Sequence, residues 1–211
     1  MMTKNNKRIL VVDFYDSFTY NIVAECKRLF EIYHICSDIQ VCPWDKLEVF
    51  LTADQTENQV IIWGPGPGTV SEYEAINPVV KKCLDNQQLF NMGICLGHQI
   101  ILHHLGHKLV LAKRPRHGES ISIRLPAWSI YPPQMRGKIV QVQLYNSWVV
   151  EGNIQVKNFA YLYYHGAIMG ASGKNLLTYQ FHPESIGTSF PEIFFLPLIN
   201  KLCNNGSTLK N

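Results

Sequence analysis

The sequence predicts an α/β fold with a doubly wound, mostly parallel central sheet flanked by helices. Three short apolar runs, at residues 9–12, 60–63 and 89–94, have the composition of strands that are buried on both faces. Helical patterns separate these runs, and such alternation at this spacing is typical of parallel sheets. From Leu111 onward the segments become shorter and more β-like, so we expect a smaller antiparallel β element in the C-terminal half.

In the first half, strands and helices are expected to alternate. Asp16 and Ser17 supply N-cap chemistry for a helix that reaches Leu29 or Phe30. A weaker strand over 33–39 and a helix over 44–51 follow. A third helix is expected over 74–86, with Pro78 in its first turn. A fourth helix should begin directly after the 89–94 strand.

In the second half, five short strands are expected, over 120–123, 138–144, 156–162, 167–171 and 176–181. The turn Tyr163-Tyr164-His165-Gly166 predicts an antiparallel hairpin. The chain should close with a helix over about 192–203 and a polar tail that frays. Because no internal repeat or linker divides the sequence, we expect a single domain over residues 1–211.

Composition limits the classes of function. The chain has 211 residues, of which 46% are apolar and 17% charged, so it can bury a core of its own. The formal net charge of +3 is small and the basic residues are scattered, which argues against nucleic-acid binding. No stretch approaches the apolar length of a membrane span. We therefore expect a soluble protein with neither of these partners.

The six cysteines form no CxxC pair, and residues 1–6 lack the apolar core of a signal peptide. We therefore expect reduced thiols and a cytoplasmic location. His103, His104 and His107 suggest a metal site. No acidic or cysteine ligand accompanies them at a useful spacing, so no metal is expected in this chain.

Cys95 is the first candidate for chemistry. It stands in Gly-Ile-Cys-Leu-Gly-His-Gln, residues 93–99, between a predicted strand and a predicted helix. A nucleophile on such a sharp turn needs small neighbours, because the strand and helix pass close to each other. The helix N-terminus would stabilise the thiolate and offer N–H groups to an oxyanion. Taken alone, the pattern Gly-x-Cys-x-Gly is more often a buried structural cysteine beside a turn.

Residues 64–68, Gly-Pro-Gly-Pro-Gly, follow the 60–63 strand. They are not a phosphate-binding loop, because the Lys-Ser/Thr of that motif is absent. Prolines lack N–H groups, so the available donors are those of the glycines. This loop, Asp13 and Cys95 all fall at the ends of predicted strands, where ligands bind in such sheets. A glycine N–H that faces Cys95 would be a second oxyanion donor.

His182 and Glu184 follow the last apolar strand, in Gln-Phe-His-Pro-Glu-Ser. Pro183 favours an extended conformation at His182, and residues two apart in an extended segment point the same way. A carboxylate beside an imidazole fixes its tautomer and stabilises the imidazolium. Cys95, His182 and Glu184 would then supply nucleophile, base and orienting group for acyl transfer through a thioester. A lone His-x-Glu is otherwise a common surface coincidence.

Six segments, at residues 13–21, 64–68, 93–99, 112–118, 145–147 and 180–185, occur in the order and spacing of a known family. Together they resemble the triad-type (class I) glutamine amidotransferases over nearly the whole chain. The nearest resemblance is to the glutaminase subunit of anthranilate synthase and of aminodeoxychorismate synthase. The motifs Asp-Ser-Phe-Thr-Tyr-Asn and Pro-Gly-Pro-Gly point to this chorismate-using branch.

The resemblance implies a role for each matching position. Cys95 would attack the glutamine side-chain amide, His182 would act as base and then acid, and Glu184 would hold His182. The N–H groups of Gly66 and Leu96 would form the oxyanion hole. The residues that position glutamine would be Gly66, Pro67, Gly68, Gln99, Ser147 and Trp148, the last two through backbone groups.

The resemblance also implies partners. Ammonia would pass to a chorismate-binding large subunit that makes anthranilate or 4-amino-4-deoxychorismate, and any magnesium ion would belong to that subunit. No cofactor is implied for this chain. The alternatives are an interaction protein that keeps the fold without chemistry, and a free-standing thiol hydrolase that acts on another amide.

The sequence departs from the family pattern at a few positions. Gly64 stands where serine is common, and Glu119 where lysine is usual. Asn146 and Trp148 lie in a segment that usually reads Tyr-His-Ser-Leu, and residues 120–134 match poorly. None of these departures removes a catalytic group. We expect them to affect the shape of the glutamine pocket or the face that meets the partner.

Overall fold

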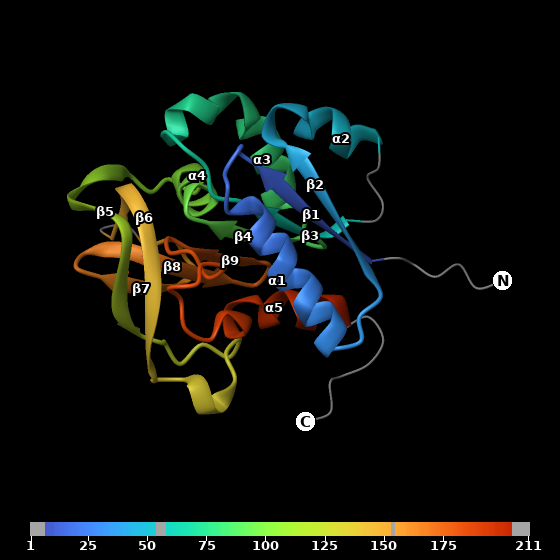
Figure 1. Ribbon diagram of the computed structural model, residues 1–211. Helices are drawn as coiled ribbons and strands as arrows, with labels where there is room; N and C mark the ends of the chain where they lie inside the picture. The colour runs from blue at the N-terminus through green and yellow to red at the C-terminus, as the bar shows by residue number, and fades with distance from the viewer. Residues whose placement is uncertain (1–6, 54–57, 153–154, 204–211) are drawn as a thin grey trace.

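A single mixed sheet organises the chain (Figure 1). The computed structural model describes residues 7–53, 58–152 and 155–203. Within these residues, nine strands form one sheet in the order β2-β1-β3-β4-β9-β8-β6-β5, and β7 pairs with β8. The sheet has a parallel half built mainly from the first part of the chain and an antiparallel half built from the second.

The parallel half matches the predicted core strands. Its members, in sheet order, are β2 (Ser37–Pro43), β1 (Lys7–Asp13), β3 (Asn58–Trp63), β4 (Phe90–Ile94) and β9 (Leu176–Tyr179). All neighbours in this half run parallel. The carboxyl ends of β1, β3 and β4 therefore meet at one edge of the sheet, and they carry Asp13, the 64–68 loop and Cys95, as predicted.

Helices cover both faces of the parallel half. On β1, Ile9 and Val11 pack into one core with residues of α1 (Thr19–Ile32) and α5 (Pro191–Cys203). Leu10 and Val12 point the other way, into a core shared with three helices, α2 (Leu47–Ala53), α3 (Asn77–Asp85) and α4 (Leu96–His104). Figure 1 shows α1 and α5 on one side of these strands and α2, α3 and α4 on the other. The doubly wound fold is confirmed.

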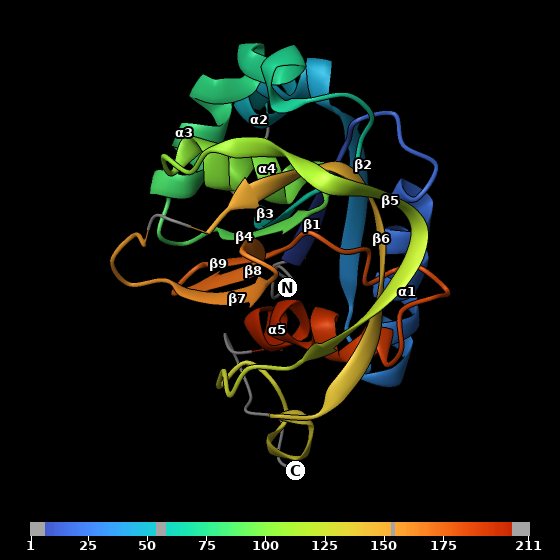
Figure 2. The same cartoon turned by 90° about the vertical axis from the view of Figure 1, so that its left-hand side faces the viewer.

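The antiparallel strands extend the same sheet. They are β8 (Ala167–Gly173), β6 (Ile139–Glu151), β5 (Leu109–Arg124) and β7 (Ala160–Tyr164). The β7–β8 hairpin turns at His165 and Gly166, which both have positive φ (48° and 82°), and this confirms the predicted hairpin. In Figure 2, β5 and β6 run together as a long curved ribbon beside the rest of the sheet.

Several predicted boundaries were wrong. β2 covers Ser37–Pro43 rather than 33–39, and β7 begins at Ala160 rather than at residue 156. β5 was expected only over 120–123, yet it begins at Leu109; β6 was expected to end at residue 144, yet it continues to Glu151. Most residues of β5 are exposed or half-buried, so backbone pairing with β6 makes this strand rather than an apolar repeat.

The helices follow the predicted order with small shifts. Residues expected at the starts of the second and third helices form short 3₁₀ turns, Trp44–Lys46 and Val70–Ile76. Pro78 lies in the first turn of α3, as predicted. All six cysteines lie in the described part of the chain and none forms a disulfide. No helix within the described ranges is long and apolar enough to span a membrane. Residues 1–6 and the tail from 204 lie outside the described residues.

Candidate active site

Cys95 occupies the sharp turn between β4 and α4. Its backbone has φ 52° and ψ −103°, a conformation that L-residues rarely adopt. Two hydrogen bonds hold it there: the Cys95 N–H donates to the Tyr179 carbonyl (2.8 Å), and the Gln99 N–H donates to the Cys95 carbonyl (3.1 Å). The residue is buried, with 6% of its surface exposed. This geometry is that of a nucleophile elbow.

The two glycines around Cys95 are required by packing. A Cβ atom on Gly97 would lie 2.1 Å from the Trp63 carbonyl oxygen on β3, and one on Gly93 would lie 2.8 Å from the Gly97 backbone. Helix α4 therefore rests directly against the strands at its first turn. The predicted reason for the pattern Gly-x-Cys-x-Gly, a close approach of strand and helix, is correct.

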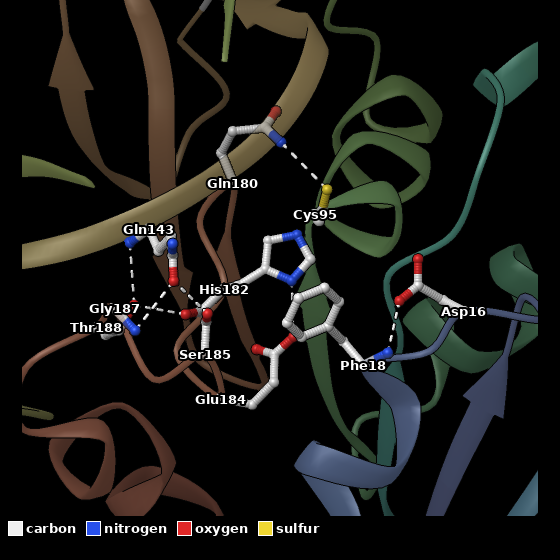
Figure 3. A network of polar contacts seen from close by, with 10 residues as sticks. All are labelled: Asp16, Phe18, Cys95, Gln143, Gln180, His182, Glu184, Ser185, Gly187 and Thr188. Atoms are coloured by element: carbon white, nitrogen blue, oxygen red, sulfur yellow. Dashed lines mark hydrogen bonds and ion pairs between the residues drawn. The ribbon is translucent and has the colours of Figure 1, made fainter. Parts of the chain in front are cut away.

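His182 and Glu184 form a buried pair. His182 Nδ1 lies 2.8 Å from Glu184 Oε1, and both side chains are at most 2% exposed. Figure 3 shows the His182 ring between the Cys95 sulfur and the Glu184 carboxylate. The other ring nitrogen, Nε2, is buried and forms no hydrogen bond to any described residue. The Cys-His-Glu arrangement predicted from the sequence is therefore assembled.

The local backbone differs from the prediction. Pro183 and Glu184 lie in a turn, closed by a hydrogen bond from the Ser185 N–H to the His182 carbonyl (3.2 Å). An extended segment was expected to bring His182 and Glu184 to one side. The turn does so instead, by folding the carboxylate back onto the ring.

The pKa of His182 is raised well above its usual value. Burial alone would lower it, because a charged ring is poorly solvated in the interior. The negative charge of Cys95 and the hydrogen bond and charge of Glu184 outweigh this effect. These neighbours therefore favour the protonated, charged form of the His182 ring.

Strand β6 holds the His182 turn in place. The His182 N–H donates to the Gln143 carbonyl (2.9 Å), and Gln143 Oε1 accepts from the Ser185 hydroxyl (2.5 Å) and the Gly187 N–H (3.0 Å) (Figure 3). The Thr188 hydroxyl donates to the His182 carbonyl (2.6 Å). Gln143 was not predicted as part of the site, because a glutamine on a strand has no characteristic sequence pattern.

A cavity of about 330 Å³ opens beside Cys95. It is lined by every residue that the resemblance assigned to glutamine or to the oxyanion: Gly66, Pro67, Gly68, Cys95, Leu96, Gln99, Ser147 and Trp148. Four further residues complete the wall: Thr69, His117, Tyr145 and Asn146. His117, Tyr145 and Asn146 fall in segments that carried the resemblance, but no role had been assigned to them.

The predicted oxyanion donors lie at the right elements. Leu96 is the first residue of α4, so its N–H has no partner within the helix. A Cβ atom on Gly66 would lie 2.5 Å from both Leu96 Cδ2 and Phe14 Cβ, so the loop backbone passes close to the start of α4. The two backbone segments therefore flank the mouth of the cavity at Cys95.

Side-chain amides connect the cavity wall. Gln99 Nε2 donates to the Trp148 carbonyl (2.9 Å) and to Gln180 Oε1 (3.1 Å), and Asn146 Nδ2 donates to the same Trp148 carbonyl (2.9 Å). The Trp148 backbone carbonyl therefore joins the Gln99 and Asn146 side chains. The Ser147 hydroxyl lies 3.2 Å from His117 Nε2.

Two departures from the family pattern have a structural reason. A Cβ atom at Gly64 would lie 2.7 Å from the Val12 carbonyl oxygen, so this loop is packed too closely for a side chain. Glu119 forms ion pairs with Arg116 and with Arg114 (3.3 Å) on the same strand. Glu119 therefore stays on β5 and does not line the cavity.

Two of the three histidines considered for a metal site, His103 and His107, have structural partners. His103 Nδ1 lies 3.3 Å from the His107 carbonyl oxygen, and His107 Nε2 lies 3.1 Å from the Tyr161 hydroxyl. Among the residues that the structure describes, no three His, Cys, Asp or Glu side chains gather as a metal site would require.

Comparison with known proteins shows the family. Residues 10–201 match the family described as glutamine amidotransferase class-I. The chain is 30% identical over 185 residues to anthranilate synthase component 2 of Lactococcus lactis, covering 85% of this chain and 87% of the relative. It is 33% identical over 183 residues to the protein of the same name from Haemophilus influenzae, covering 85% and 90%.

Solved structures share the fold. A Thermoplasma acidophilum structure, assigned to a GMP synthase, aligns with a TM-score of 0.77 at 20% identity, over 95% of this chain and 96% of that one. A glutamine amidotransferase from Thermotoga maritima aligns with a TM-score of 0.68 at 12% identity, over 85% and 76%. With the family match spanning nearly the whole sequence, this chain belongs to the class I glutamine amidotransferases.

Proposed function

We propose that this chain is the glutaminase subunit of a chorismate-aminating synthase. It would hydrolyse L-glutamine through a cysteinyl thioester and deliver the ammonia to a chorismate-binding large subunit. The observation that carries the proposal is the 330 Å³ cavity that brings Cys95 together with Gln99, Ser147 and Trp148. Its size suits a single amino acid, and its wall combines a nucleophile with convergent polar groups.

The first half of the reaction uses the buried pair beside the cavity. The Cys95 thiolate attacks the side-chain amide carbon of glutamine, and the carbonyl oxygen becomes an oxyanion. The N–H groups of Gly66 and Leu96 are the proposed donors to that oxyanion. The His182 imidazolium then gives its proton to the amide nitrogen, so that the C–N bond breaks, ammonia leaves and a glutamyl thioester remains.

The second half uses the same groups in reverse. Neutral His182 takes a proton from a water molecule, which attacks the thioester carbon. The C–S bond breaks, and the products are glutamate and the Cys95 thiolate beside a reprotonated His182. Glu184 stays ionised throughout and holds the ring, which is the role of the third member of a catalytic triad. The balance is glutamine plus water to glutamate, ammonia and a proton, and this chain needs no cofactor for it.

The surface beside the site supports a partner subunit. Tyr15 and Tyr20 are 60% and 67% exposed and flank Phe18, whose ring packs 5.0 Å from the His182 ring. Ile186, two residues after Glu184, is fully exposed. Exposed apolar groups around a site are typical of a protein–protein contact. Delivery through such a contact keeps ammonia out of water, where it is mostly protonated at neutral pH and no longer a nucleophile.

The relatives named anthranilate synthase component 2 favour a chorismate-using partner. We propose anthranilate or 4-amino-4-deoxychorismate as the product of the complex. Co-purification of this chain from its own cells, followed by identification of the large subunit, distinguishes these two products. A magnesium requirement, if one exists, would belong to that subunit.

The central experiment measures glutamate release from glutamine, with and without a chorismate-binding subunit. We expect activity in the wild type that increases with the partner, and none in Cys95→Ser. Cys83→Ser is the matched control, because Cys83 is also buried but lies on α3, away from the cavity. Equal activity in wild type and Cys95→Ser would refute the thioester mechanism.

The same assay separates the two alternatives. An interaction protein without chemistry would release no glutamate and would leave Cys95 unmodified by a glutamine-analogue electrophile. A free-standing thiol hydrolase would prefer another amide in a substrate panel and would not respond to the partner.

A further inference from the structure

Gln180 is a buried glutamine that lies against the nucleophile. It directly follows β9, and its side chain is fully buried. Its Nε2 lies 3.8 Å from Cys95 Sγ, within hydrogen-bond range for sulfur, and its Oε1 accepts from Gln99 Nε2 (3.1 Å). Figure 3 shows the Gln180 amide reaching the sulfur from the side opposite to the Glu184 carboxylate. Gln180 is not among the residues that line the cavity.

The network fixes which end of the Gln180 amide faces the sulfur. A backbone carbonyl can only accept, so the Gln99 atom next to the Trp148 carbonyl must be the NH₂ group. That same NH₂ also contacts Gln180, so the Gln180 atom facing it must be the oxygen. The remaining Gln180 atom, next to Cys95, is therefore a donor.

A donor at this position favours the charged form of the nucleophile. A thiolate accepts hydrogen bonds more strongly than a thiol, and the 6% exposure of Cys95 leaves little access for water. The other ionisable groups near the sulfur are the His182 and Glu184 pair, and His117 and Tyr145 across the cavity. Gln180 adds a neutral donor that points at the sulfur itself.

We propose that Gln180 is a positioning residue for the nucleophile. Its amide orients and stabilises the Cys95 sulfur and, through Gln99, connects that sulfur to the wall of the substrate cavity. Its part in turnover rests on the proposed function, because only that function makes glutamine the occupant of the cavity. The hydrogen bond to the sulfur does not depend on the substrate.

The test is the pH dependence of Cys95 alkylation in the full-length chain. Iodoacetamide labelling is followed peptide by peptide by mass spectrometry, so that Cys95 is separated from the exposed Cys36. Cys26 and Cys83 should label slowly, because burial raises the pKa of each thiol to about 12. In Gln180→Met we expect the midpoint of Cys95 labelling to move upward by about one pH unit. Gln180→Glu, which puts a carboxyl group against the sulfur, should move it further.

Thr178→Val is the matched control. Thr178 is buried on β9, two residues before Gln180, and its hydroxyl lies 2.9 Å from His98 Nδ1 on α4. The variant therefore removes a buried hydrogen bond between the same strand and the same helix without touching Cys95. We expect its labelling midpoint to equal that of the wild type.

An unshifted midpoint in Gln180→Met, or an equal shift in Thr178→Val, overturns the proposal. If Gln180→Met does not fold, the labelling midpoint of Gln99→Met tests the proposal instead. This variant keeps Gln180 but removes the hydrogen bond from Gln99 that fixes the orientation of the Gln180 amide. An upward shift in that variant supports the role of Gln180, and a wild-type midpoint overturns it. Glutamine turnover is scored separately. Wild type without turnover would refute the proposed function and leave the labelling result to stand by itself.

Discussion

The backbone strain at Cys95 predicts an unusual order of stability between two inactive variants. At an ordinary buried position alanine is more stable than glycine. At Cys95 we expect the reverse, with Cys95→Gly more stable than Cys95→Ala. The reason is the backbone conformation, φ 52° and ψ −103°, which any residue with a Cβ atom adopts only under strain.

The size of the effect follows from three contributions. Strain at these angles, which lie outside the left-handed helical region, costs alanine about 3 kcal/mol. Glycine loses about 1 kcal/mol through the greater entropy of its unfolded chain. It also loses one buried methyl group, worth about 0.8 kcal/mol. Cys95→Gly should therefore be the more stable variant by about 1 kcal/mol, which corresponds to a Tm higher by about 2–4 °C for a chain of this size.

The assay is thermal and urea unfolding of both variants, with Cys83 as the matched control. Cys83 is 2% exposed in the last turn of α3, where the backbone is helical. There helix propensity of about 1 kcal/mol and the lost methyl both favour alanine. The free energy of unfolding of Cys83→Ala should therefore exceed that of Cys83→Gly by about 2 kcal/mol. If the alanine variant is more stable than the glycine variant at Cys95 as well as at Cys83, the claim that the backbone at Cys95 is strained is refuted.

Three further predictions concern the site and the core. Glu184→Gln should lower the pKa of His182, measured by NMR of the ring nitrogens. The raised pKa of His182 stabilises the folded state at low pH, and this contribution is lost as the pH rises through that pKa. The difference in stability between wild type and Glu184→Gln should therefore narrow as the pH rises above about 6.5, the ordinary pKa of histidine; a constant difference would contradict this. Gly97→Ala should cost about 3 kcal/mol in urea unfolding, because its Cβ atom would lie 2.1 Å from the Trp63 carbonyl oxygen. A Cβ atom at Gly106 would have no heavy atom within 4 Å, so Gly106→Ala should lower the free energy of unfolding by only about 1 kcal/mol. Equal losses of stability in the two variants would argue against the close approach of α4 to β3 at Gly97. Tyr131→Phe removes the 3.0 Å hydrogen bond to the buried Tyr179 hydroxyl and should lower the free energy of unfolding by about 1–2 kcal/mol. Changing both Tyr131 and Tyr179 to Phe should lower it by less than the sum of the two single changes. Strict additivity would show that the two hydroxyls are not coupled.

Three strands of the parallel half, β1, β3 and β4, were predictable because they are buried on both faces. Short, continuous apolar runs such as residues 60–63 are typical of such strands when a turn sequence follows directly, as residues 64–68 do here. The ribbon of β5 and β6 was not predictable to the same extent. β5 lies at the edge of the sheet, carries Pro115 and Gly118, and pairs with β6 through two register shifts. Such a strand has no regular alternation of apolar and polar residues.

The residue types of the candidate site were also predictable, and their contacts were only partly so. Cys95, His182 and Glu184 could be chosen because a nucleophile, a base and a carboxylate have recognisable sequence neighbours. The contact between Gln180 and the Cys95 sulfur could not be predicted from the sequence, because it depends on which end of the Gln180 amide faces the sulfur. That orientation is decided by a backbone carbonyl at Trp148, in a distant segment of the chain.

The pairing of β4 with β9 has a consequence for how such proteins diverge. Cys95 lies at the end of one of these adjacent parallel strands and His182 just beyond the end of the other, and the Cys95 N–H donates to the Tyr179 carbonyl of β9. The relative position of these two residues is thus set by the framework of the sheet. Most of the chain between α4 and β9 builds the ribbon of β5 and β6, which lines the cavity, and the β7–β8 hairpin. Mutations there can reshape the cavity wall and the neighbouring surface while Cys95, His182 and Glu184 keep their places.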